Sequence, residues 1–212
     1  MSRGPRLALK AAVWAACLAP LAMLAHRFHV DDLGANPIDL VTDSLGIWAL
    51  RLLLASLALT PLRILFGLSW PVTLRRLLGL FAFAYVALHL ATWVVLDHFF
   101  DWPVMLADVL KRPYVTVGMA AFVLLVPLAA TSTAGMIKRL GARAWRRLHR
   151  LVYASAVLAV LHFLWLAKVG RVEPYVYAAI LGVLLGVRGI DVARRRLRRR
   201  RADPRDLLVS AP

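Results

Sequence analysis

Long apolar runs separated by short charged stretches dominate the chain, and six of them are long enough to cross a membrane as helices. A helix rises about 1.5 Å per residue, so a hydrocarbon core about 30 Å thick needs about 20 apolar residues. The pattern therefore predicts an all-α fold, a polytopic membrane bundle of about six transmembrane helices. The predicted spans are residues 7–25, 45–65, 77–96, 115–130, 151–168 and 175–190.

The composition supports one membrane domain without a second, soluble one. Hydrophobic residues make up 61% of the 212 positions, whereas a soluble domain is about 45–50% apolar. We expect one domain over residues 1–190 and a basic cytoplasmic tail over residues 191–212. The first run resembles a signal peptide because basic residues precede it, but its length and the lack of a clean cleavage site favour an uncleaved helix.

The charged residues predict the orientation of the bundle. If the N-terminus faces the cytoplasm, 21 of the 27 Lys and Arg residues lie on that side and five on the other, with Arg51 inside the second span. Cytoplasmic loops of membrane proteins are enriched in Lys and Arg. We therefore expect both termini in the cytoplasm and a location in the bacterial inner membrane. The arginine-rich run at residues 194–201 is explained by the lipid bilayer, and no nucleic-acid partner is expected.

The single cysteine limits the metal chemistry that is available. Cys17 lies alone in an apolar run, so the chain has no intrachain disulfide and no thiolate cluster for zinc or iron–sulfur. The Cys-x-x-Cys-His motif of c-type haem is absent as well. Any haem would be bound non-covalently.

Two histidines lie deep in predicted spans that run in the same direction. His89 is in the third span and His162 in the fifth, at similar predicted depth. An ionisable group in hydrocarbon is a candidate functional residue, although an interhelical hydrogen bond would also explain it. The spans offer no carboxylate for a proton relay, and no cysteine or carboxylate lies at that depth to complete a zinc site, whereas haem iron needs only two axial ligands. This pair therefore favours haem.

A third histidine lies at the cytoplasmic edge, level with a possible second haem. His149 is expected to open the fifth helix, about 20 Å before His162 and about 140° away around an ideal helix. An interfacial histidine in a basic loop is the alternative. The remaining histidines, at the outer ends of spans, are expected to be solvated and receive no role: His26, His29 and His98.

Arginines occupy the position where a fourth histidine would complete two sites. Arg75 precedes His89 by 14 residues, which leaves an offset of only about 40° on a helix. Arg75 and its neighbour Arg76 are candidate haem ligands or partners of haem propionates, because guanidinium groups bind carboxylates through charge-assisted hydrogen bonds. A solvated basic pair is the alternative. Other arginines that could bind propionates are Arg146, Arg147 and Arg150.

Short motifs along nearly the whole chain resemble those of the MsrQ (YedZ) family of haem-binding membrane subunits. The motifs are Gly34-Ala-Asn-Pro37, Gly46-Ile-Trp, Thr60-Pro-Leu-Arg63, Arg75-Arg-Leu-Leu-Gly79, Leu88-His89, Lys111-Arg-Pro-Tyr114, Thr131-Ser132, Trp145-x-x-Leu-His149-Arg-x-x-Tyr153 and His162-x-x-Trp165-x-x-Lys168.

This resemblance implies a ferric-reductase-like transmembrane domain that binds one or two b-type haems and FMN. By matching positions, it implies that His89, His149 and His162 ligate haem iron and that Arg75 belongs to the family's basic pair. It also implies electron transfer from the quinone pool, or from a cytosolic flavin reductase, to a periplasmic molybdopterin enzyme, MsrP. That partner, in a heterodimer with the membrane subunit, reduces methionine sulfoxide in oxidised periplasmic proteins.

Two other classes of function remain open at this point. A small-solute or proton-coupled transporter could use the intramembrane histidines, although broken helices and buried carboxylates are not indicated. A structural membrane scaffold would need none of the histidines. The chain has no G-x-G-x-x-G nucleotide motif, so an electron-transfer subunit would take its electrons from a quinol or a separate reductase rather than act as the catalytic subunit.

Overall fold

The computed structural model describes residues 3–166 and 170–201, and this part of the chain contains helices but no strand. A 3₁₀ turn, Trp70–Leu74, precedes the third helix and a π-helical turn, Trp93–Asp97, follows it. The helices are α1 (Arg3–His29), α2 (Pro37–Phe66), α3 (Arg75–Thr92), α4 (Trp102–Lys111), α5 (Pro113–Ala130), α6 (Ala134–Leu148), α7 (Leu151–Leu166) and α8 (Glu173–Arg201).

The prediction of an all-α membrane bundle with about six spans is confirmed. Among the described residues, five helices are long and apolar enough to cross a membrane: α1, α2, α3 with its flanking turns, α5 and α8. A sixth span results if α6 and α7, which meet at an angle of 44°, count as one bent crossing. Residues 167 and 168 of the predicted fifth span lie outside the described residues.

Two helices lie in segments that the span pattern leaves as loops. The side chain of Asp101 accepts a hydrogen bond from the Val104 N–H at 3.2 Å and so caps α4. Thr133 accepts one from the Met136 N–H at 3.2 Å and caps α6. Both helices are shorter than a membrane span, which is why a search for long apolar runs misses them.

Two boundaries also differ from the prediction. The second helix begins at Pro37 rather than at residue 45, because Asn36 and Pro37 start it before the apolar run does. The last helix continues through the expected tail to Arg201, while residues 202–212 lie outside the described residues. Gly67, in the left-handed conformation with φ of 70°, ends α2 by donating its N–H to the Arg63 carbonyl.

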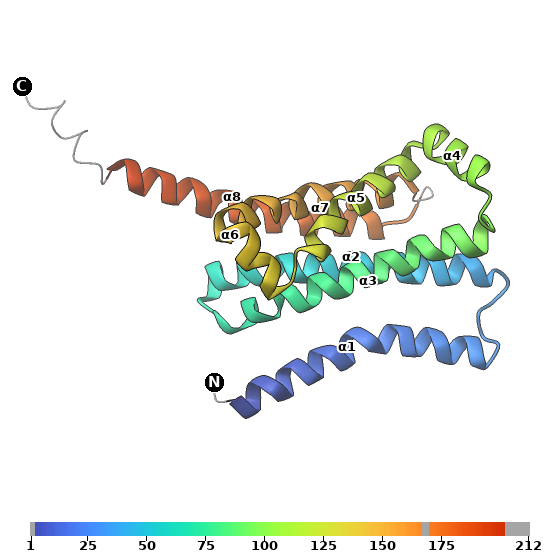
Figure 1. Ribbon diagram of the computed structural model, residues 1–212, viewed down its shortest axis with the longest axis horizontal. Helices are drawn as coiled ribbons and strands as arrows, with labels where there is room; N and C mark the ends of the chain where they lie inside the picture. The colour runs from blue at the N-terminus through green and yellow to red at the C-terminus, as the bar shows by residue number, and fades with distance from the viewer. Residues whose placement is uncertain (1–2, 167–169, 202–212) are drawn as a thin grey trace, which may run out of the picture.

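The bundle is built from two closely packed helix pairs, α2 with α3 and α5 with α7 (Figure 1). Helix α8 packs against α2 and α7, and α1 lies at the edge. The core contains leucines of α2 together with Tyr85 and Ala156, which are at most 1% exposed. The Tyr85 hydroxyl donates to the Cys17 carbonyl at 2.7 Å and so attaches α1 to α3.

The two ends of the bundle carry different residues. One end, here called the basic end, holds the start of α1, the start of α3, helix α6 and the end of α8 (Figure 1). The opposite end, here called the acidic end, holds α4 and the connection between α1 and α2. Because α1 starts and α8 ends at the same end, the described helices cross the bundle an even number of times.

Packing between α5 and α7 predicts the effect of enlarging a small side chain. Ala156 is fully buried, and the neighbouring Ser155 hydroxyl donates to the Ala121 carbonyl at 2.9 Å. Ala156→Leu should destabilise the fold by about 1–3 kcal/mol, because the extra atoms have no space. Thermal unfolding in detergent micelles measures this effect. Ala154→Leu, at an exposed position two residues away, is the control, and equal unfolding temperatures for both variants would contradict the packing described here.

Candidate functional site

The structure brings the imidazole rings of His89 and His162 together in the interior of the bundle. His89 is on α3 and His162 on α7, and their ring centroids are 6.4 Å apart with an angle of 76° between the ring planes. Both side chains are partly buried. The two residues that the depth argument matches therefore do face each other.

Each of these rings is held by a backbone carbonyl on the partner helix. The Nδ1 of His89 lies 2.8 Å from the Thr42 carbonyl on α2, and the Nδ1 of His162 lies 2.7 Å from the Tyr114 carbonyl on α5. A carbonyl oxygen can only accept, so each Nδ1 carries the hydrogen and donates it. The Nε2 of each neutral ring then keeps its lone pair for a ligand.

A glycine next to each ring makes this close approach possible. A Cβ atom on Gly46 would lie 3.0 Å from the Nδ1 and Cε1 atoms of His89. A Cβ atom on Gly118 would lie 2.7 Å from the Nδ1 atom of His162. Any larger residue at either position would displace the ring or the helix that carries it.

The same arrangement occurs in both helix pairs. In each pair, the accepting carbonyl comes four residues before the glycine, so carbonyl and glycine lie one helical turn apart on the face that meets the histidine. Sequence reasoning missed these partners. Gly46 is part of a recognised motif, but a carbonyl acceptor has no residue-type signature, and only the packing of α2 on α3 and α5 on α7 identifies it.

His149 lies in the break between α6 and α7. The sequence predicts instead that it lies in the first turn of the fifth span. The prediction that it opens the helix is wrong, and the ideal-helix angle of about 140° to His162 does not apply. The ring stacks on Trp145 with centroids 3.8 Å apart, and its Nδ1 donates to the Trp145 carbonyl at 3.1 Å.

Besides Trp145, the His149 ring has two polar neighbours among the described residues, the Ser132 hydroxyl and the Leu128 carbonyl. The Ser132 hydroxyl lies 3.4 Å from Nε2, but it has a single hydrogen and donates it to the Leu128 carbonyl at 2.7 Å; a carbonyl has no hydrogen to donate, so neither group donates to the Nε2 lone pair. His149 therefore shares one property with His89 and His162: its Nδ1 donates to a backbone carbonyl and its Nε2 is available.

The candidate arginines differ in their environment. Arg75 is the first residue of α3 and is partly buried, and its charge acts on His149. Arg76 is exposed. The other three arginines considered as propionate partners are also exposed: Arg146, Arg147 and Arg150. Arg75 is thus the one of these five that the fold brings into the interior near His149.

The arrangement suits a group that needs two imidazole ligands better than a bare metal ion. Within the described ranges, no three His, Cys, Asp or Glu residues come together in a way that could hold a metal ion. Structural and catalytic zinc sites use at least three protein ligands. Haem supplies four nitrogen ligands of its own and takes its axial ligands from the protein.

Comparison with known proteins places the chain in a family. Residues 45–160 match the family model described as "Ferric reductase like transmembrane component". A relative from Rhodospirillum rubrum, named "Protein-methionine-sulfoxide reductase heme-binding subunit MsrQ", is 55% identical over 87% of this chain and 89% of its own length. The chain belongs to the MsrQ family.

Two further relatives carry the same printed name. The protein from Xanthomonas euvesicatoria is 48% identical over 93% of this chain and 94% of its own length. The protein from Caulobacter vibrioides is 51% identical over 82% of both chains. The resemblance to the MsrQ family that the motifs indicate is therefore confirmed, and it extends over α1 to α8 rather than over the ferric-reductase-like region alone.

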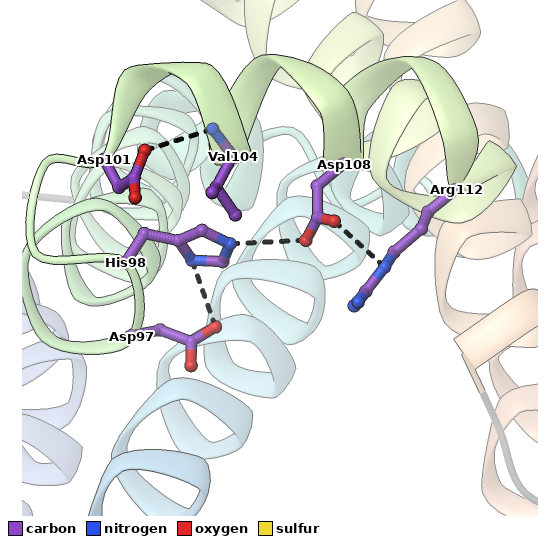
Figure 2. Close-up of a pocket in the computed structure, with 6 residues that line it drawn as sticks. All are labelled: Asp97, His98, Asp101, Val104, Asp108 and Arg112. Carbon is purple, nitrogen blue, oxygen red and sulfur yellow. Dashed lines mark hydrogen bonds and ion pairs between the residues drawn. The ribbon is translucent and has the colours of Figure 1, made fainter.

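The outer histidines of this MsrQ family member divide into two kinds. His26 and His29 are exposed, as expected. The expectation that His98 is solvated is wrong, because its side chain is only 10% exposed. Figure 2 shows its ring between two carboxylates, with Nδ1 3.3 Å from Asp97 and Nε2 3.2 Å from Asp108.

The contacts of His98 connect the end of α3 to α4. Asp108 also pairs with Arg112 at 3.2 Å, and these residues line an open pocket of about 370 Å³ at the acidic end (Figure 2). A hydrogen bond with the Tyr114 hydroxyl and then the Asp108 carboxylate raise the pKa of Arg112 above its usual range, so this partner stays charged. Since both ring nitrogens of His98 are engaged, it differs from the three inner histidines and serves the fold.

A structural role for His98 predicts a loss of stability without a change at the inner histidines. His98→Ala should lower the free energy of unfolding by about 1–3 kcal/mol, because Asp108 loses a partner in a largely buried position. His26→Ala, at an exposed site, should change it by less than about 0.5 kcal/mol. Denaturant unfolding in detergent measures both, and equal stability of the two variants would contradict this role.

Proposed function

We propose that the chain binds b-type haem between its helices and passes electrons through it to a methionine-sulfoxide reductase. The observation that carries this proposal is the pair of facing imidazoles, His89 and His162, each with an available Nε2. The printed names of the MsrQ relatives, which call them heme-binding subunits of that reductase, support it.

The residues fit such a group. With metal–nitrogen bonds of about 2 Å, two imidazoles whose centroids are about 6 Å apart could both ligate one metal ion. The observed separation is 6.4 Å. Haem iron held by two histidines would supply reversible one-electron chemistry.

The protein's own contribution is to orient the ligands and exclude water. The Thr42 and Tyr114 carbonyls fix each ring by accepting from Nδ1 and make Nε2 a stronger donor to a metal. Gly46 and Gly118 give the rings the space to reach those carbonyls. The pair is partly buried in a bundle whose core is built from apolar side chains that include those of α2, α3, α5 and α7.

His149 is the proposed protein ligand of a second haem. Its Nε2 is available, and the partly buried Arg75 lies close enough for its charge to act on the ring. In this proposal, Arg75 is either a ligand of the haem iron or a partner of a haem propionate. Arg76, which is exposed, contacts a propionate from the surface. His162 follows Leu151, the first residue of α7, by 11 residues, so at about 1.5 Å per residue roughly 16 Å of helix separates it from the break that holds His149.

The proposed direction of electron flow uses the orientation of the bundle in the membrane that the charged residues support. The Lys and Arg count supports a cytoplasmic basic end and a periplasmic acidic end in the bacterial inner membrane. In the proposed function, a quinol or a cytosolic flavin reductase supplies the electrons, with FMN as a further cofactor. The periplasmic molybdopterin enzyme MsrP receives them in a heterodimer and repairs oxidised proteins, and residues 191–212 form a basic tail on the cytoplasmic side.

The proposed ligands predict how haem content changes with each histidine. The wild-type protein, purified in detergent, should show low-spin haem absorbance. His89→Ala and His162→Ala should each lose the haem of the shared site, while His149→Ala should lose only the other, about half of the total. Haem and iron per polypeptide measure this. His98→Ala is the control and should keep the full content; unchanged spectra in His89→Ala would overturn the assignment.

The glycine at the second helix pair gives an independent test that leaves every ligand in place. Gly118→Ala puts a Cβ atom 2.7 Å from His162 Nδ1, so the ring must move away from the Tyr114 carbonyl. Bound haem should fall at least twofold. Gly182→Ala, in a membrane helix where nothing lies within 4 Å of the new atom, should bind haem like the wild type. Equal haem content in the two variants would show that Gly118 does not position His162.

A further inference from the structure

A partly buried arginine on the last helix, Arg188, has hydrogen-bond donors that its protein neighbours do not fully use. Arg188 lies in the membrane helix α8, and its two terminal nitrogens donate to the Tyr153 hydroxyl and, at 2.6 Å, to the Leu57 carbonyl. The guanidinium carbon is 5.1 Å from the centre of the Tyr153 ring. The Nε atom is buried and has no hydrogen-bond partner among the described residues.

One of these contacts has a local structural reason. Pro61 lies inside α2 and has no N–H, so the Leu57 carbonyl four residues before it lacks its usual helical donor. Arg188 supplies that donor. A neutral amide would do the same, however, and placing a positive charge in the membrane interior is costly. The Leu57 contact therefore explains a donor at this place but not a cation.

Two further cations act on Arg188, and among the described residues no carboxylate pairs with any of the three. The charges of Arg75 on α3, which is partly buried, and of Arg63 on α2, which is exposed, both act on Arg188. Ion pairs within the part of the chain that the structure describes involve other basic residues: Arg27, His98, Arg112 and Arg195. Like charges repel one another most where they are partly buried, as Arg75 and Arg188 are, and an anion bound beside them would offset that repulsion.

Two of these arginines are connected to the histidine at the basic end, His149. Tyr153, on which Arg188 rests, follows His149 by four residues, and the charge of Arg75 acts on both His149 and Arg188. A guanidinium has five N–H donors, and Arg188 uses two of them within the protein. The remaining donors, the buried Nε–H included, suit the paired oxygens of a carboxylate or phosphate.

We propose that Arg63, Arg75 and Arg188 form an anion site that binds the acidic group of a cofactor placed against His149. The group is an oxyanion, either a haem propionate or the phosphate of FMN. Arg188 is the anchored member, because Tyr153 and the Leu57 carbonyl hold its guanidinium in place. The identity of the bound cofactor rests on the proposed function. The positions of the three arginines do not depend on that function.

The test compares cofactor content in variants that separate charge from hydrogen bonding. Arg188→Gln keeps an N–H donor for the Leu57 carbonyl but removes the charge, and Arg188→Lys keeps the charge but loses the planar fork. Arg194→Gln, at an exposed position on the same helix, is the matched control. Haem, FMN and retained phospholipid per polypeptide are measured for the wild type and each variant after purification in detergent.

We expect Arg188→Gln to lose at least half of one cofactor, Arg188→Lys to lose less, and Arg194→Gln to match the wild type. Loss of haem identifies a propionate as the anion, and loss of FMN identifies a phosphate. The haem spectrum of the His89–His162 site should persist in Arg188→Gln, which shows that the variant is folded.

Three results would overturn the anion site. Unchanged haem and FMN in Arg188→Gln, equal losses in Arg188→Gln and Arg194→Gln, or loss of phospholipid alone would each do so. A wild-type protein without any haem would instead refute the proposed function. The two failures are therefore distinguishable, because the second appears before any arginine is changed.

Discussion

The arrangement on which the candidate site depends is a hydrogen bond from a histidine Nδ1 to a backbone carbonyl, made next to a glycine. It occurs between α2 and α3 at His89 and again between α5 and α7 at His162. The bond compensates for burying a polar ring, and it selects the tautomer in which Nε2 is free. Helix packing, ring orientation and ligand chemistry are therefore coupled, because neither histidine can meet its carbonyl unless the paired helices approach as closely as glycine allows.

The sequence contains enough information for the spans and for the two central histidines. Long apolar runs identify membrane helices directly, and counting residues along two helices that run in the same direction predicts that His89 and His162 lie at similar depth. The partners of those rings could not be predicted. Thr42 and Tyr114 contribute through main-chain atoms, and Gly118 matters only because another helix lies against it. These are properties of tertiary packing rather than of residue type.

Errors at the ends of the bundle have a similar physical cause. The apolar pattern predicts a continuous helix through His149, but the chain bends by 44° between α6 and α7, and nothing in that pattern marks the break. Because His98 follows a predicted span, the sequence predicts a solvated side chain. The short helix α4 comes next, and its Asp108, ten residues after His98, reaches the ring. Both errors arise where short helices, too short to span, determine what is buried.

The repetition of the histidine arrangement has a consequence for how the protein is assembled in the membrane. Each helix pair carries one histidine that is already oriented by contacts within that pair, so each pair is a half-site that is complete except for its partner. The second pair, α5 with α7, follows α4 in the chain. Helices α2 and α3 can therefore be inserted into the membrane before the second pair has been synthesised. The ring-to-ring distance of 6.4 Å depends on how the two helix pairs pack against each other. A group that bridged both rings would therefore require both pairs in place, and its retention would report that the two halves are correctly joined.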